Sequence, residues 1–190
     1  MSSKSDPRID GLIARIRSTD EAVSGAAWQS AGPYGAPAVQ PLATLMAAED
    51  FELARKAKRA LYLVVRHAGH PTRTRERKAI ERELIPLLKT SPTSARREII
   101  WMLSEIGSAP SIKPLAAQLV VPELREDARC ALTRHPDPGA RAALKSAFSA
   151  ASDEFKYALA ESLRQHGVNV QGYPSRKLEP TAQTTVRPPA

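Results

Sequence analysis

The chain has 190 residues, a formal net charge of +8, one cysteine and an aromatic content of only 5%. This size fits one ordinary domain, a single cysteine excludes a disulfide framework or a multi-cysteine zinc site, and no apolar run approaches the roughly 18–20 residues that span a bilayer. Abundant Ala, Leu and Arg favour helices over a β-sandwich. We therefore expect a soluble, cytoplasmic, all-α protein.

The N-terminal residues 1–7 lack the apolar core of a secretory signal, and we expect them to be flexible. From residue 8 onward, glycines end apolar helical runs at Gly32, Gly69, Gly107 and Gly167. The last interval is about twice the length of a unit, and its midpoint at residues 135–139 is itself a helix stop. This spacing predicts about five units between residues 8 and 167.

An internal repeat supports these units. Residues 36–43 (Ala-Pro-Ala-Val-Gln-Pro-Leu-Ala) align with residues 109–116 (Ala-Pro-Ser-Ile-Lys-Pro-Leu-Ala), and the same offset relates Trp28 to Trp101. Each unit reads as two short helices, and comparable second helices run through residues 61–68, 95–107, 128–132 and 157–163. Because such helices are marginal alone, stacking them side by side as an α-solenoid buries their apolar stripes.

Residues 95–115 carry the sequence Ala-Arg-Arg, then Leu-Ser-Glu-Ile-Gly-Ser-Ala-Pro-Ser-Ile-Lys-Pro-Leu, which resembles a HEAT repeat of the short bacterial type. The resemblance implies a superhelix of about five antiparallel helix pairs over residues 8–167. The proline that HEAT repeats carry early in the first helix is matched by Pro41, Pro86 and Pro114. The sequence departs from the pattern at residues 70–79, which lengthen one unit.

HEAT repeats also carry a basic residue near the start of the second helix. Four residues match it in step with the units, namely Lys58, Arg96, Arg125 and Lys156. The resemblance implies that this ladder is structural and forms hydrogen bonds across neighbouring units. A charged stripe for a partner is the alternative.

The last segment, residues 168–190, is rich in Pro, Thr, Gln, Ser and Lys and has few apolar residues. This composition predicts an irregular, flexible, Pro-rich C-terminal tail, not a sixth unit.

The net charge is concentrated in one segment. Residues 55–82 contain ten basic and two acidic residues, which accounts for the whole excess of +8. Because a local excess attracts phosphates or acidic protein surfaces, we expect the partner-binding site here. Three arginines at alternate positions, 73, 75 and 77, would share one side of an extended loop, whereas on a helix Arg73 and Arg77 would align. The candidate partner-binding residues are Arg59, Arg66, His70, Arg73, Arg75, Arg77 and Lys78.

No catalytic, cofactor or metal site is expected. The chain has no Gly-x-Ser-x-Gly elbow and no phosphate-binding glycine loop, and His67 and His70 have no nearby third ligand. His135 and His166 are interpreted as structural residues at helix ends, Cys130 as a buried small side chain, and the tryptophans as core or partly buried.

These features favour a non-enzymatic scaffold that binds an acidic protein partner. Binding to a nucleic-acid backbone is the first alternative, and a salt-dependent affinity would support it. A lyase of the HEAT-like type that acts on a tetrapyrrole chromophore is a weaker alternative, to which no particular residue points.

Overall fold

The computed structural model describes residues 6–175, and this part of the chain contains helices and turns but no strand. The helices are α1 (Pro7–Ile16), α2 (Glu21–Gln29), the 3-10 helices η1 (Gly32–Tyr34) and η2 (Ala36–Ala38), α3 (Val39–Met46), α4 (Phe51–Ala68), α5 (Thr74–Thr90), α6 (Thr93–Ile106), α7 (Ala109–Ala116), α8 (Arg125–Arg134), α9 (Pro138–Ala150) and α10 (Asp153–Gln165). The all-α class predicted from composition is therefore confirmed.

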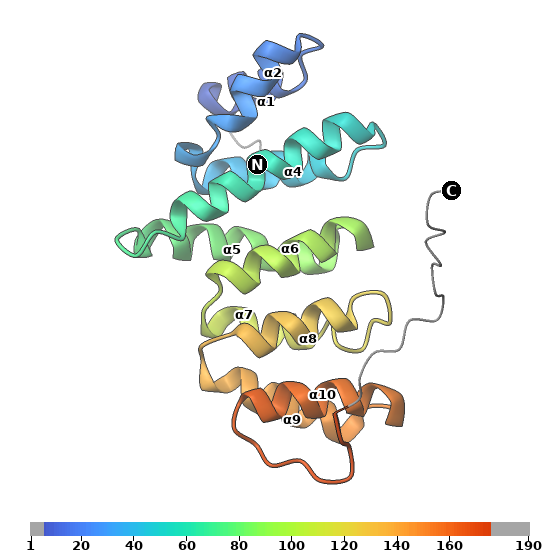
Figure 1. Cartoon of the computed structure of the whole chain (residues 1–190). Helices are drawn as coiled ribbons and strands as arrows, with labels where there is room; N and C mark the ends of the chain where they lie inside the picture. The colour runs from blue at the N-terminus through green and yellow to red at the C-terminus, as the bar shows by residue number, and fades with distance from the viewer. Residues whose placement is uncertain (1–5, 176–190) are drawn as a thin grey trace, which may run out of the picture.

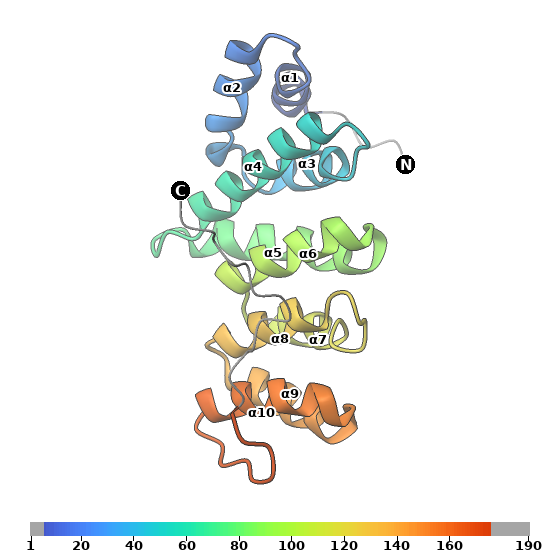
Figure 2. The ribbon, with the colours of Figure 1, turned by 45° about the vertical axis from the view of Figure 1, so that its right-hand side comes forward.

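The helices follow one another in pairs along one direction of the molecule (Figures 1 and 2). Each of the pairs α1/α2, α3/α4, α5/α6, α7/α8 and α9/α10 is packed together. Contacts between pairs run mainly along two rows, and α4 also meets α5 and α8 meets α9. One row joins α1, α3, α5, α7 and α9, and the other joins α2, α4, α6, α8 and α10. A side chain on any helix therefore meets mainly its own pair and the pairs directly before and after it.

Local sequence explains where several helices begin. Asp6, Asp20, Asp50 and Asp137 each precede a helix, and each side chain accepts hydrogen bonds from backbone N–H groups of the first turn. Such caps satisfy donors that the helix itself leaves open and contribute about 1 kcal/mol each. The apolar stripes then meet in one continuous core of mostly Leu, Ile, Val and Ala.

The middle helix pairs contribute several fully buried side chains to this core. Leu61 of α4, Ile80 of α5 and Ile100 and Leu103 of α6 are fully buried. Each such side chain contributes about 1.5–3 kcal/mol relative to exposure in water. The apolar residues within 95–106 recur at helical spacing and are buried together. This burial stabilises the helix that the sequence predicts there.

Both ends of the described chain are more ordered than the sequence suggests. Helix α1 begins at Pro7 and is capped by Asp6, inside the expected flexible segment 1–7, whose residues 1–5 lie outside the described part. Residues 168–175, assigned to the flexible tail, pack on the last helix pair, and Val168 and Val170 contact the core. The rest of the predicted tail, residues 176–190, lies outside the described part.

The ring of Tyr173 fixes segment 168–175 in place. It meets the rings of Phe148 on α9 and Tyr157 on α10 edge-on, at centroid distances of 5.3 and 5.2 Å. Arg164 of α10 donates hydrogen bonds to the carbonyl oxygens of Val170 and Tyr173. These contacts come from several residues and join both helices of the pair.

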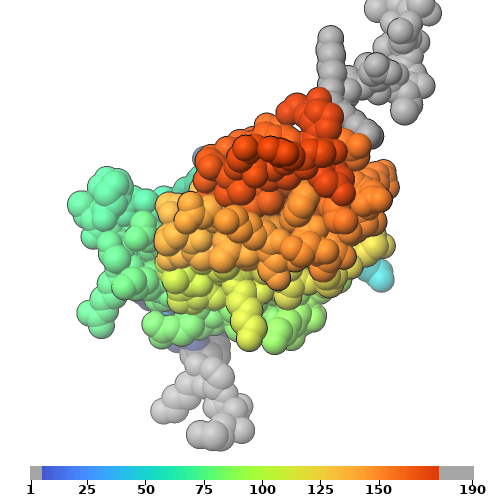
Figure 3. Space-filling view, turned by 90° about the horizontal axis from the view of Figure 1, so that it is seen from below, coloured from blue at the N-terminus to red at the C-terminus, as the bar shows by residue number. Residues whose placement is uncertain are grey.

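Residues 70–79, where the sequence departs from the repeat, do not form a long loop. Helix α4 ends at Ala68, a short turn follows, and Thr74 already begins the 17 residues of α5. Arg75 and Arg77 therefore lie on a helix, as the helical alternative expects, whereas Arg73 directly precedes its first residue. The turn between α4 and α5 projects from the side of the stack in the end-on view (Figure 3).

Candidate interaction surface

The basic segment 55–82 is divided between two helices, and the cations on α4 are already engaged. Lys56 is buried, and its Nζ lies 2.8 Å from the Glu21 carboxylate and 3.0 Å from the Ser24 hydroxyl of α2. Lys58 Nζ lies 3.1 Å from Glu98 of α6. These pairs join α4 to the helices on either side of it, so they hold the stack together.

Two of the candidate partner-binding residues on α4 also have internal partners. The guanidinium of Arg59 lies 5.3 Å from the ring centroid of Trp28. Arg66 donates two hydrogen bonds of 3.3 Å to Glu105 and lies over the Tyr62 ring. Hydrogen bonding and attraction to Glu105 raise the pKa of Arg66. Both arginines remain exposed at the surface, but their charges are directed to neighbouring helices.

In the turn before α5, two further candidate residues also have partners within the protein. Arg73 donates hydrogen bonds of 2.9 and 3.0 Å to Glu76, three residues further on. The His70 ring lies 2.9 Å from the Thr72 hydroxyl. These two candidates therefore stabilise the turn and the first turn of the helix.

Within the basic segment and the rest of α5, free positive charge lies along one face of that helix. Four exposed cations of α5 have no ion pair or hydrogen bond within residues 6–175, and they are Arg75, Lys78, Arg82 and Lys89. Their spacings of three, four and seven residues place them on one side of the helix. At 1.5 Å per residue the stripe is about 21 Å long. We call these four residues the basic face of α5.

Of the seven candidate residues, only Arg75 and Lys78 belong to this face. Arg77 also has no partner within the described residues, but it is half-buried and points away from the face by its helical position. Arg82 and Lys89, which complete this face, are not among the candidates predicted from the sequence. The seven-residue spacing of positions 75, 82 and 89 is the signal that could have identified them.

A groove of about 580 Å³ lies beside the basic face. From α5 it is lined by Lys78, Glu81, Arg82 and Ile85. The other wall is formed by the start of α7 at residues 108–110 and by Asp137 at the start of α9. We call it the α5–α7 groove.

Behind this groove, the carboxylate of Glu81 holds the start of α7. Glu81 is buried, and its two oxygens accept hydrogen bonds of 2.6 Å from the backbone N–H and the hydroxyl of Ser108. Ser108 stands before the first residue of α7, where a helix leaves backbone donors open. A carboxylate from α5 thus supplies the cap that α7 lacks in its own sequence.

A second buried polar pair lies next to it. His135 Nδ1 accepts a hydrogen bond from the Asp137 backbone N–H, so in the neutral ring Nε2 carries the proton and donates to the Ser111 hydroxyl at 3.3 Å. The Ser111 hydroxyl donates in turn to the Ser108 carbonyl oxygen at 2.8 Å. In this arrangement His135 is not placed to remove a proton from Ser111. It packs at the end of α8, as the sequence interpretation of this histidine expects.

Burial lowers the pKa of His135 below the usual value of 6.5. The unfolded chain therefore binds a proton there at a higher pH than the folded chain does. We expect the free energy of unfolding to fall as the pH decreases below about 6.5 towards the lowered pKa of the folded state. Urea unfolding followed by circular dichroism at several pH values between 7 and 5 measures this slope.

The variant His135→Gln removes the titrating group and is expected to flatten this slope. His70→Gln, at an exposed turn, is the matched control and should keep the slope of the unmodified chain. Equal slopes for all three proteins would show that His135 does not link protonation to stability.

The basic ladder is only partly a set of contacts between units. Lys58 reaches Glu98, and the Arg125 guanidinium lies 4.9 Å from the ring centroid of Phe155 in the next pair. Arg96 and Lys156, however, form hydrogen bonds to Thr93 and Asp153 of their own helices. Of the four positions, Lys58 thus forms the implied hydrogen bond across neighbouring units, and Arg125 meets the next pair through an aromatic ring instead.

Residues outside the ladder also form contacts between neighbouring pairs. Arg97 of α6 lies 3.0 Å from Asp127 of α8, and the Trp101 indole donates to the same carboxylate at 2.8 Å. Arg129 of α8 donates to the buried Ser162 hydroxyl of α10 at 2.8 Å. The two tryptophans are half-buried, and each lies beside an arginine of the neighbouring pair.

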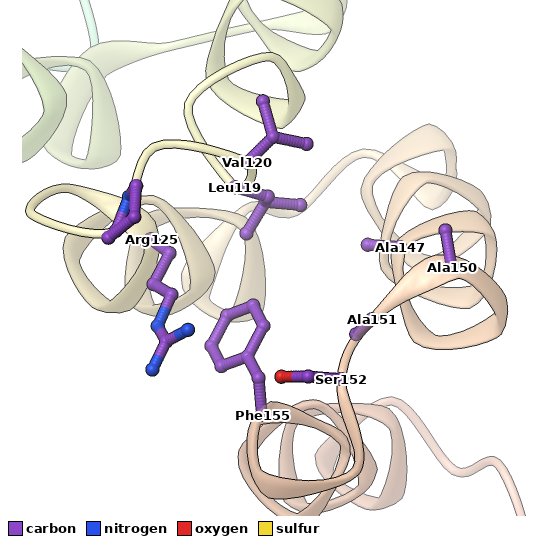
Figure 4. A pocket seen from close by; sticks show the side chains of 9 residues that line it. Leu119, Val120, Arg125, Ala147, Ala150, Ala151, Ser152 and Phe155 are labelled. Carbon is purple, nitrogen blue, oxygen red and sulfur yellow. The ribbon is translucent and has the colours of Figure 1, made fainter.

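A smaller hollow of about 200 Å³ lies at the opposite end of the helices, between the α7–α8 turn and the start of α10 (Figure 4). Leu119 and Phe155 form its apolar side, and Val120 beside it is 83% exposed. The Arg125 side chain borders it but stacks on Phe155. Its volume is below the ~300–1,000 Å³ of typical small-molecule sites.

Within residues 6–175, no helix combines the length and hydrophobicity needed to cross a membrane, and no three acidic, His or Cys side chains are grouped to hold a metal ion. Cys130 is half-buried, where the sequence predicts a buried side chain, and Arg129 donates to its sulfur at 3.4 Å.

Comparison with known proteins gives little further information. No family model and no curated protein matches the chain. A crystal structure of an engineered protein is among the solved structures that match. It is 20% identical, the match covers 83% of this chain and 78% of that chain, and the TM-score is 0.44.

Proposed function

We propose that this chain is a non-catalytic interaction module that binds an acidic protein partner through the basic face of α5. The observation that supports the proposal is that Arg75, Lys78, Arg82 and Lys89 are exposed, unpaired within the described residues and aligned on one helix. The cations on α4 have partners on neighbouring helices or, for Arg55, on α4 itself, so the excess charge of the segment is available mainly on α5.

The proposal includes a HEAT-like α-solenoid as the scaffold. It is supported by the repeat at residues 36–43 and 109–116 and by the two rows of contacts between successive helix pairs. Scaffolds of this kind use extended surfaces to bind partners. We also propose a cytoplasmic location, which agrees with the single cysteine and its lack of a disulfide partner.

A protein partner is favoured over a nucleic-acid backbone because the basic face borders the α5–α7 groove, whose lining includes Ile85, Ala109 and Pro110. A phosphate backbone has no apolar group to fill such a groove. The nucleic-acid alternative makes a different prediction, which the same experiment measures.

The test is a double charge reversal on the basic face. Arg75→Glu with Arg82→Glu is expected to weaken binding of a fluorescent poly-glutamate peptide at least tenfold, about 1.4 kcal/mol, because attraction becomes repulsion at two sites. The matched control, Arg17→Glu with Lys145→Glu, changes the net charge equally at exposed cations directly after α1 and on α9 and should alter affinity less than twofold. Fluorescence anisotropy measures both affinities, and circular dichroism checks that helix content is unchanged.

Two outcomes would contradict the proposal. Equal losses in both double variants would mean that net charge alone, and not the basic face, attracts the peptide. Tighter binding of a DNA duplex than of poly-glutamate at the same salt concentration, with a steep decline as salt is raised, would favour the nucleic-acid alternative.

A further inference from the structure

The α5–α7 groove has apolar lining residues as well as charged ones. Ile85 on α5 faces Ala109 and Pro110 at the start of α7, and together they give the groove an apolar wall. The volume of about 580 Å³ falls within the ~300–1,000 Å³ range typical of binding sites and is ample for one large side chain. Apolar surface that stays open to water gains free energy when a ligand covers it.

The charged side chains that line the groove differ in whether they already have a partner within the protein. Its two carboxylates are already in use, since Glu81 accepts from Ser108 twice and Asp137 caps the Gly139 backbone N–H at 2.8 Å. Its two cations, Lys78 and Arg82, form no ion pair or hydrogen bond within the described residues. A ligand in the groove therefore meets cations whose charges have no partner, beside an apolar wall.

The basic face of α5 extends beyond the groove in both directions along the helix. Arg75 and Lys89 each lie seven residues from Arg82, about 10 Å along the helix axis on either side. A ligand that contacts the groove and the whole basic face must be about 20 Å long, which suits a peptide segment and not a small metabolite.

From this geometry we infer that the partner is recognised through an acidic peptide segment with a large apolar side chain, which enters the α5–α7 groove while carboxylates on both sides of it pair with the basic face. The inference rests on the proposed function and adds the kind of segment that is bound. Charge attracts the segment and the apolar side chain fixes its position, because exposed ion pairs alone contribute little.

The first experiment compares two fluorescent peptides of equal length and charge on the unmodified chain. Each is a run of glutamates with one central residue, Phe in one peptide and Ser in the other. We expect the Phe peptide to bind at least tenfold more tightly by fluorescence anisotropy, and the difference to persist at high salt. Because no variant is needed, this result does not depend on the folding of an altered protein.

The second experiment blocks the groove without changing charge. Ala109→Trp places a large ring on the exposed start of α7, and Ala26→Trp places the same ring on exposed α2, away from the groove, as the control. We expect Ala109→Trp to remove the advantage of the Phe peptide while the Ser peptide binds within twofold of its original affinity. Ala26→Trp should leave both affinities unchanged.

The outcomes separate the inference from the proposed function. If both peptides bind the unmodified chain equally and Arg75→Glu with Arg82→Glu still weakens them, the basic face binds acidic partners but the groove does not select an apolar side chain. If that charge reversal has no effect on either peptide, the proposed function itself fails. A Phe preference that survives in Ala109→Trp would place the apolar contact elsewhere and overturn the inference.

Discussion

Replacing Glu81 by alanine is expected to lower the free energy of unfolding by about 2–4 kcal/mol, although the residue is neither apolar nor part of the core. The variant would leave the Ser108 N–H and hydroxyl without their acceptor at a half-buried helix start. Losing a charged acceptor costs about 1.5–3 kcal/mol for each hydrogen bond, and partial solvation of Ser108 reduces the sum. Urea unfolding followed by circular dichroism measures the change.

Glu81→Gln is the conservative comparison. Its amide oxygen can still accept from the Ser108 N–H, and the Ser108 hydroxyl can rotate to accept from the amide NH₂ group. We expect a loss of about 1 kcal/mol, because the bonds to a charged group become bonds to a neutral one. If Ala and Gln at position 81 were equally stable, the carboxylate would not be the cap of α7.

Replacing Gly107 by alanine is expected to cost about 2–3 kcal/mol for a steric reason. A methyl group at this position would lie against the Leu103 carbonyl oxygen and 2.5 Å from the Ser111 hydroxyl oxygen. The carbonyl belongs to the last turn of α6 and accepts the hydrogen bond that ends that helix, so it cannot move freely. Thermal and urea unfolding both report the loss.

Gly25→Ala is a control for which we expect the opposite change in the free energy of unfolding. Gly25 lies inside α2, and a methyl group there would meet no atom within 4 Å. Alanine is favoured over glycine in helix interiors by about 0.5–1 kcal/mol, so this variant should be more stable than the unmodified chain. A loss of stability in Gly25→Ala, or none in Gly107→Ala, would contradict the packing described for these two helices.

The sequence predicts the helices well because their signals are local. Ile99, Ile100, Leu103 and Ile106 have helical spacing, and the structure buries all four within α6. Gly107 follows the last residue of that helix, as the glycine spacing predicts. Such patterns depend only on the residues of one segment, so no knowledge of the neighbouring segments is needed.

The interaction surface is predicted less completely, because charge has to be assigned to partners that are distant in sequence. Arg66 and Arg75 look alike in a count of basic residues, yet Arg66 pairs with Glu105 of another helix while Arg75 has no ion pair or hydrogen bond within the described residues. Whether Arg66 reaches Glu105 depends on how α4 and α6 are aligned against each other. Lys89 lies outside the densest basic run and shares the face only because α5 continues unbroken to residue 90.

Segment 168–175 also covers part of the last described helix pair. A molecule assembled from similar layers has no built-in last layer, since each layer presents side chains on which another can be added. Here Tyr173 and the two valines occupy the outer surface of α9 and α10. An added helix pair, or the end of a second molecule, would first have to displace them. A design that adds a helix pair after α10 must therefore replace these eight residues.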